Sequence, residues 1–135
     1  MKLAVPKERK VKENRVSLTP DIVKVLINEG FNCVVEKDAG VNSYITDKDY
    51  EGAGATIIDN TQNLYSDADI VLKINAPSPD EVGMMKEGAV LISFMFAAIN
   101  PELVEACAKQ KISAFSMDAI PRISRSEERR VGKEC

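Results

Sequence analysis

The chain contains no histidine, so it lacks the side chain that most often serves as a general base near neutral pH. No serine or cysteine can therefore be activated as a nucleophile by an imidazole partner within this sequence. If these residues belong to an enzyme, either they do not carry out the acid-base step or the reaction needs none.

Other features are scarce as well. The three cysteines, Cys33, Cys107 and Cys135, are widely spaced and match no metal-ligand pattern, so we interpret Cys33 and Cys107 as reduced core residues. The longest apolar run, residues 89–99, is far shorter than the roughly 20 residues that cross a bilayer. The net charge of −3 is spread along the chain, which argues against a nucleic-acid partner. The first residues, MKLAVP, favour a strand over an apolar signal segment, so we expect a cytoplasmic location.

Short β-branched runs alternate with amphipathic segments, a pattern typical of parallel strands joined by crossover helices. Several of the runs are apolar almost throughout, as strands covered on both faces should be. We therefore expect an α/β fold, a flavodoxin-like or Rossmann-like parallel sheet flanked by helices. The six predicted strands are residues 2–6, 32–36, 55–59, 69–74, 89–95 and 112–117.

Three helix starts are indicated by a capping residue directly before a proline: Thr19-Pro20, Ser78-Pro79 and Asn100-Pro101. Glu81 follows Ser78 by three residues and predicts a capping box. Gly30, Gly54 and Gly88 follow the helical patterns, where a left-handed backbone favours glycine. The GAGA stretch around Gly52 and Gly54 precedes a strand, so it is no nucleotide-binding fingerprint, which requires a strand, then glycines, then a helix.

Two charged or polar loops follow predicted strands, at the sheet edge where α/β proteins bind ligands. In the first, KERKVKENRVSL, the side chains of Glu8, Lys10, Glu13 and Arg15 could hold a carboxylate or phosphate, or could form surface ion pairs on a solvated loop. In the second, KINAPSP, Lys73 could pair with an anion and Asn75 could offer its amide, although such a turn also needs no ligand to explain it.

Further candidates lie after the last two strands. Phe94, Met95 and Phe96 form an aromatic cluster that is more typical of core than of a pocket wall. Arg122 and Arg125, in PRISR, could grip a phosphate or a nicotinamide amide.

Residues 125–135, RSEERRVGKEC, have no apolar period and differ in character from the rest. They are consistent with a solvated charged tail. They also resemble a translated sequencing adapter, in which case the native protein continues beyond Ser124 or Arg125. We expect the native domain to occupy residues 1–124 and the tail 125–135 to be non-native.

The motifs VPKE, ENRV, LTP, GAGA, LKINAP and PRISR together resemble the N-terminal region shared by alanine dehydrogenases and the alpha subunit of proton-translocating nicotinamide nucleotide transhydrogenase. LKINAP and PRISR are closest to the transhydrogenase pattern. The resemblance covers residues 1 to about 124.

For alanine dehydrogenases the resemblance implies an arginine that binds the substrate carboxylate, at Arg15, together with a lysine and a histidine. Those last two positions hold Asn75 and Phe96 here. Neither side chain can exchange a proton as reductive amination requires, whereas hydride passage from NADH to NADP⁺ needs no protein acid.

The resemblance thus implies a portion of the NAD(H)-binding subunit of a transhydrogenase, with Arg122 at the cofactor and Arg15, Lys73 and Asn75 as possible cleft residues. It implies NADP(H) on a partner domain or subunit, a beta subunit with membrane segments, and a homo-oligomeric intact subunit peripheral to the cytoplasmic membrane. The NAD-gripping unit lies downstream in that family, so we expect this incomplete domain to be inactive alone and to bind NADH negligibly. An alanine dehydrogenase, or a non-catalytic binding module of the same fold, is the alternative.

Overall fold

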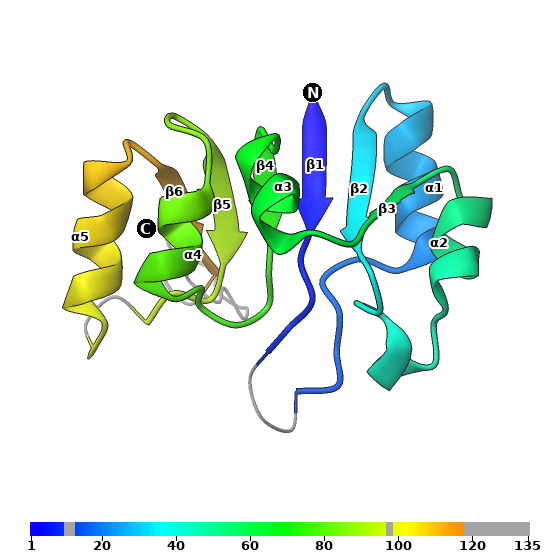
Figure 1. Cartoon of the computed structure of the whole chain (residues 1–135), viewed down its shortest axis with the longest axis horizontal. Helices are drawn as coiled ribbons and strands as arrows, with labels where there is room; N and C mark the ends of the chain where they lie inside the picture. Colours follow the sequence, from blue (N-terminus) through cyan, green and yellow to red (C-terminus); the bar gives the residue numbers. More distant parts are fainter. Residues whose placement is uncertain (10–12, 97–98, 118–135) are drawn as a thin grey trace, which may run out of the picture.

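The computed structural model describes residues 1–9, 13–96 and 99–117 (Figure 1). Strands and helices alternate along the chain, as expected for an α/β protein. The six strands are β1 (Lys2–Val5), β2 (Asn32–Glu36), β3 (Thr56–Ile58), β4 (Ile70–Leu72), β5 (Val90–Ser93) and β6 (Ser113–Ser116). The helices are α1 (Pro20–Asn28), α2 (Asp47–Gly52), α3 (Thr61–Ser66), α4 (Pro79–Met84) and α5 (Pro101–Lys109), with a short 3₁₀ turn, η1 (Val41–Ser43).

The strands form one sheet in the order β3-β2-β1-β4-β5-β6, and every neighbouring pair is parallel. The predicted parallel α/β sheet is confirmed, with each predicted strand found within the expected residues. The order is that of the Rossmann arrangement, in which successive strands are added in one direction from β1 to β3 and in the opposite direction from β4 to β6. Ligands of such sheets bind outside the carboxyl ends of the strands at this reversal.

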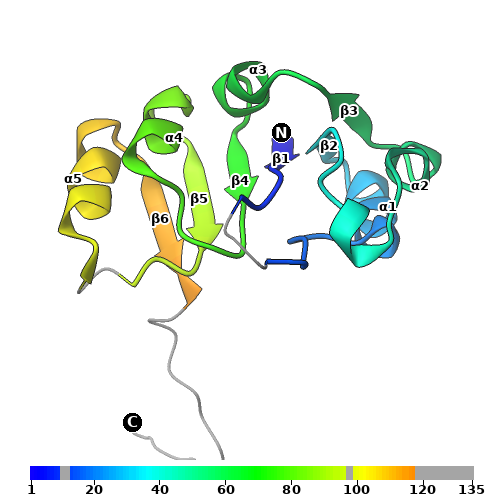
Figure 2. The same ribbon diagram turned by 60° about the horizontal axis from the view of Figure 1, so that its bottom comes forward.

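Two apolar layers cover the sheet, one on each face. The first lies under α3, α4 and α5 and includes Leu64, Tyr65 and Leu103. The second lies under α1 and α2 and includes Val23 and Tyr50. Figure 2 shows α3, α4 and α5 along one face, with α1 and α2 near β2 and β3. The alternation in β1 explains this division, because Ala4 points into the first layer while Leu3 and Val5 point into the second.

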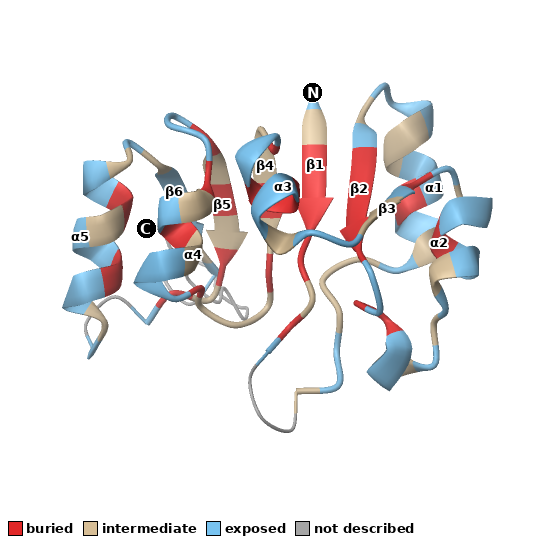
Figure 3. Cartoon of the chain, viewed as in Figure 1, coloured by how far each residue is buried: buried red, intermediate tan, exposed pale blue. Residues whose placement is uncertain are grey.

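Burial on the second face falls off toward β6. Figure 3 shows β1 and β2 mostly buried and β5 partly intermediate. In register across the sheet, Val5 is fully buried, Leu72 and Ile92 are half-buried, and Phe115 is 59% exposed. This gradient arises because α1 and α2 pack against the β2 and β3 half. An all-parallel sheet is normally covered on both faces, so a half that no described helix covers fits an incomplete domain.

The three predicted helix starts are confirmed, since Thr19, Ser78 and Asn100 are the N-cap residues of α1, α4 and α5. The expected capping oxygen is present only at Ser78, whose hydroxyl and Glu81 form the predicted capping box. Thr19 makes no side-chain cap, and neither does Asn100, whose amide donates to the Met95 carbonyl at 2.9 Å. The proline, with its preset backbone angle and missing N–H, is therefore sufficient to start these two helices.

The sequence also makes predictions about three glycines, two cysteines and the lengths of the apolar runs. Gly30, Gly54 and Gly88 have the expected left-handed backbone, although Gly88 lies in the turn before β5 and not at the end of α4. Cys33 and Cys107 are buried free thiols. None of the helices in residues 1–9, 13–96 and 99–117 is long and apolar enough to span a membrane. The tail 125–135 lies outside the described residues.

Candidate functional site

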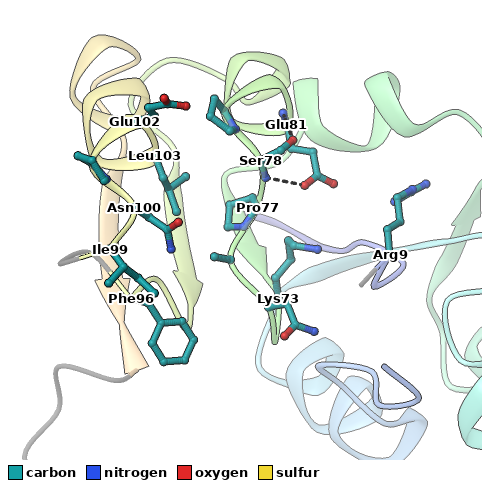
Figure 4. Close-up of a pocket in the computed structure, with 14 residues that line it drawn as sticks. Arg9, Lys73, Pro77, Ser78, Glu81, Phe96, Ile99, Asn100, Glu102 and Leu103 are labelled. Carbon is teal, nitrogen blue, oxygen red and sulfur yellow. Dashed lines mark hydrogen bonds between the residues drawn. The ribbon is translucent and has the colours of Figure 1, made fainter. Parts of the chain in front are cut away.

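A pocket of about 720 Å³ lies beyond the carboxyl ends of β4 and β5 (Figure 4). Its lining includes Lys73 and Asn75 from the segment after β4, Arg9 from the loop after β1, and Ser78 and Glu81 from the start of α4. The opposite side is formed by Phe96, Ile99, Asn100, Glu102 and Leu103, from the segment after β5 and the first turns of α5. The pocket therefore lies where the Rossmann topology places ligands.

A buried ion pair forms the base of the polar side. The carboxylate of Glu8 and the ammonium of Lys73 are 3.4 Å apart, and their side chains are only 2% and 3% exposed. Glu8 also accepts the backbone N–H groups of Ile74 at 2.8 Å and Asn75 at 3.1 Å. A buried carboxylate is stable only with such a set of donors. Glu8 thus holds the segment after β4 and has no exposed carboxylate for a ligand.

Asn75 joins this ion pair to a second one. Its side-chain Nδ2 donates to Glu13 at 2.8 Å and to Glu8 at 3.4 Å. Glu13 in turn accepts from the Arg15 side chain, at 2.9 Å from Nε and 3.0 Å from Nη2. The guanidinium of Arg15, followed by the amide of Asn75, lowers the pKa of Glu13 to about 2. Arg15 and Asn75 are therefore brought together through a carboxylate that stays ionised.

A third carboxylate, Glu36, lies at the carboxyl end of β2 and is buried. It accepts from the Arg9 guanidinium, from the Thr61 hydroxyl at 2.6 Å and from the Lys7 backbone N–H at 2.8 Å. Burial alone would raise the pKa of Glu36, but the hydrogen bonds from Arg9, Thr61 and Lys7 outweigh it and lower the pKa. In dinucleotide-binding sheets an acid at this position binds a ribose hydroxyl. Here the Glu36 carboxylate is already hydrogen-bonded to Arg9, Thr61 and the Lys7 backbone.

The other side of the pocket is largely apolar and includes Phe96 and Ile99, which are 48% and 78% exposed. Phe96 has a φ of 49°, a left-handed conformation that is strained for a bulky residue. Its ring stacks on that of Phe94, with centroids 6.1 Å apart. The aromatic cluster was expected to be core. Met95 is buried as expected, but Phe96 instead forms a pocket wall, because β5 ends at Ser93 and the chain turns outward there.

The structure brings Lys73, Asn75 and, through Glu13, Arg15 into one polar cluster. The Glu8 carboxylate is buried against Lys73 and Asn75. Glu13 pairs with the exposed Arg15, which is an ion pair of the kind that the loop sequence left open as an alternative. Arg122 and Lys10 lie outside the described residues, as does Arg125. Sequence reasoning missed Arg9 and Asn100 as pocket residues, although both follow strand ends, the one signal that could have identified them.

The described residues fit one end of a dinucleotide better than the whole molecule. The loop after β1 contains no glycine that would let a pyrophosphate approach the backbone, and the acid after β2 is occupied by Arg9. The pocket does offer an apolar wall facing a polar one, which suits a flat ring carrying a polar group.

Across residues 1–9, 13–96 and 99–117, no group of three or more cysteine, aspartate or glutamate side chains is arranged to hold a metal ion.

Comparison with known sequences gives a consistent result. The family model described as "Alanine dehydrogenase/PNT, N-terminal domain" matches residues 4–131. An NAD(P) transhydrogenase alpha subunit polypeptide of Rhodospirillum rubrum is 45% identical over 132 residues, which is 94% of this chain and 34% of the relative. Alanine dehydrogenase of Staphylococcus haemolyticus is 36% identical, covering 93% of this chain and 34% of the relative. The chain therefore spans about a third of the length of these two proteins.

Solved structures agree with this result. The transhydrogenase of Sinorhizobium meliloti superimposes with a TM-score of 0.86 at 35% identity, covering 92% of this chain and 37% of that one. An L-alanine dehydrogenase superimposes with a TM-score of 0.81 at 31% identity, covering 86% and 32%. The parallel sheet, the pocket at its carboxyl edge and these matches lead to one conclusion: the chain belongs to the family of alanine dehydrogenase/PNT N-terminal domains.

Proposed function

We propose that the chain is the N-terminal portion of the NAD(H)-binding alpha subunit of a transhydrogenase, which transfers hydride between NAD(H) and NADP(H). In the intact complex this transfer is coupled to proton translocation. Residues 1–124 supply one wall of the dinucleotide cleft, and residues 125–135 are a non-native tail. The observation that carries the proposal is the 45% identity to a transhydrogenase alpha subunit over 94% of the chain.

The composition of the pocket supports the same interpretation. Its polar side chains are two cations, two carboxylates, two amides and a hydroxyl, with no imidazole. Lys73 is buried against Glu8, so neither group is positioned as a free acid or base. Direct hydride transfer between two nicotinamide rings requires orientation and exclusion of water, and a wall without proton chemistry is sufficient for it.

Roles for individual residues follow from this assignment. Arg122 contacts NAD(H), while Arg15, Lys73 and Asn75 shape the cleft. NADP(H) is bound by a partner domain or beta subunit that carries the membrane segments, and the intact subunit is a homo-oligomer on the cytoplasmic side of the membrane. The fragment alone is inactive, because the glycine-rich NAD-binding unit belongs to the remainder of the protein.

Alanine dehydrogenase is the second candidate, favoured by the 36% identity and by the superposition on a solved alanine dehydrogenase. It requires proton transfers that Asn75 and Phe96 cannot perform. A non-catalytic module of the same fold is the third, and it predicts that the intact protein binds neither dinucleotide.

A chimeric subunit tests the three candidates together. Residues 1–117 of this chain replace the matching segment of the Rhodospirillum rubrum subunit, and the product is combined with its partner subunits. NADH-dependent reduction of an NADP⁺ analogue supports the proposal. Oxidation of NADH with pyruvate and ammonium, without transhydrogenation, supports the alanine dehydrogenase. NADH binding without either reaction, or no binding at all in a folded chimera, contradicts both enzymes.

A further inference from the structure

We propose that Asn75 makes this pocket selective for an uncharged amide over a carboxylate, because the polar wall, as far as the described residues form it, offers a ligand the oxygen of Asn75 and no uncommitted cation. The first observation is the orientation of the Asn75 side chain. Its Nδ2 donates to Glu8 and to Glu13, and both partners are carboxylates that only accept hydrogen bonds. The NH₂ group must therefore face them, and the amide oxygen is what remains for the pocket that Asn75 lines.

The second observation is the charge around the pocket. Lys73 is paired with Glu8, Arg15 with Glu13 and Arg9 with Glu36, so each of these cations has a carboxylate partner. Two more pocket residues, Glu81 and Glu102, are acidic. The described residues of these three ion pairs, together with the two acidic pocket residues, comprise three cations and five carboxylates. A ligand carboxylate would enter a region in which the described side chains carry a net negative charge, and like charges at short range strongly disfavour binding.

The third observation concerns the ligand's shape. Phe96, Ile99 and Leu103 form an apolar surface across the pocket from the polar wall. A flat ring with a primary carboxamide would place the ring on this surface and donate an N–H to the Asn75 oxygen. This step deepens the proposed function and rests on it, since it assigns the nicotinamide end of the dinucleotide to this pocket.

Nicotinamide and nicotinate are two small probes that differ only in the ring substituent that would contact the Asn75 side chain. Nicotinamide carries an uncharged carboxamide, and nicotinate carries a carboxylate on the same ring. The chimeric subunit described above, which supplies the rest of the cleft, is titrated with each at neutral pH, and binding is followed by backbone amide NMR. We expect nicotinamide to bind about tenfold more tightly than nicotinate, with shifts centred on residues 73–78 and 99–103.

Variants at position 75 make the test specific. Asn75→Lys replaces the amide with a cation between the two carboxylates, and it should abolish or reverse the preference for nicotinamide. Asn75→Leu removes the amide without adding charge, and it should weaken nicotinamide about tenfold while leaving nicotinate unchanged. Asn28→Lys adds the same charge at the exposed end of α1, remote from the pocket lining, and should leave both affinities unchanged.

Equal affinity for the two probes, tighter nicotinate in the natural sequence, or no binding of nicotinamide near Asn75 would each overturn the proposal. An unchanged preference in folded Asn75→Leu would do so even if Asn75→Lys fails to fold. These outcomes are separate from the hydride-transfer assay, because the chimera can transfer hydride even if the carboxamide of the bound NADH lies away from Asn75.

Discussion

The carboxylate of Glu8 accepts the backbone N–H of Ile74 at 2.8 Å and thereby ties the loop after β1 to the segment after β4. These two segments follow the neighbouring strands β1 and β4, between which the strand order switches direction. In many Rossmann proteins this crevice is left open for a phosphate. Here the carboxylate of Glu8 occupies it, and the pocket lies toward β5.

Glu8→Gln tests how much this contact contributes to stability. The variant leaves the ammonium of Lys73 buried without its counter-charge, so we expect the free energy of unfolding to fall by about 3 kcal/mol. Urea unfolding followed by circular dichroism measures the change. Glu87→Gln, at an exposed position, is the matched control and should change stability little. Equal stability of the two variants would show that the buried pair contributes nothing.

The ionisation of Glu13 gives a pH prediction. Its pKa is lowered from the ordinary 4.5 to about 2, so its contribution to stability is complete above pH 4.5 and is lost as the pH falls toward 2. Arg15→Met removes the first cause of this shift, and the pKa of Glu13 should rise toward its ordinary value. Carboxyl NMR titration of both chains measures it. If the pKa of Glu13 stays near 2 in Arg15→Met, Asn75 and not Arg15 is the main cause of its low value.

The two kinds of helix start differ in their dependence on the capping side chain. Ser78→Ala breaks the capping box of α4 and should lower the free energy of unfolding by about 1 kcal/mol. Thr19→Ala removes a hydroxyl that makes no cap, so its effect should be much smaller. Urea denaturation of the two variants gives the comparison. A larger loss in Thr19→Ala would contradict the assigned caps.

The half of the sheet around β5 and β6 that no described helix covers on its second face predicts self-association. Phe115 lies on the edge strand β6 and is 59% exposed, so the isolated chain should associate at high concentration. Phe115→Ser should reduce the associated fraction, measured by light scattering, with little loss of stability. Val104→Ser replaces another exposed apolar residue, on α5, and serves as the control. Equal association in both variants would assign the effect to general surface apolarity.

Much of the scaffold could be predicted because local physics decides it. Proline directly after Thr19, Ser78 or Asn100 favours a helix start through its own backbone geometry, and β-branched runs such as NCVVE favour a buried strand. The site was predicted less completely. Lys73 and Asn75 were found because they follow a strand, but their partners Glu8 and Glu13 are more than sixty residues away. No pattern in the sequence specifies which distant carboxylate a buried lysine meets.

The sequence by itself determined the α/β alternation, the helix starts, the absence of imidazole chemistry and the family resemblance, because these depend on residue type and on neighbours along the chain. The tertiary structure alone decided that Glu8, in the charged loop after β1, is buried against Lys73, that Phe96 faces a pocket and that Asn75 bridges two ion pairs. Its sheet order brings the ends of β1, β4 and β5 together, and only then do desolvation and charge pairing act between segments far apart in sequence.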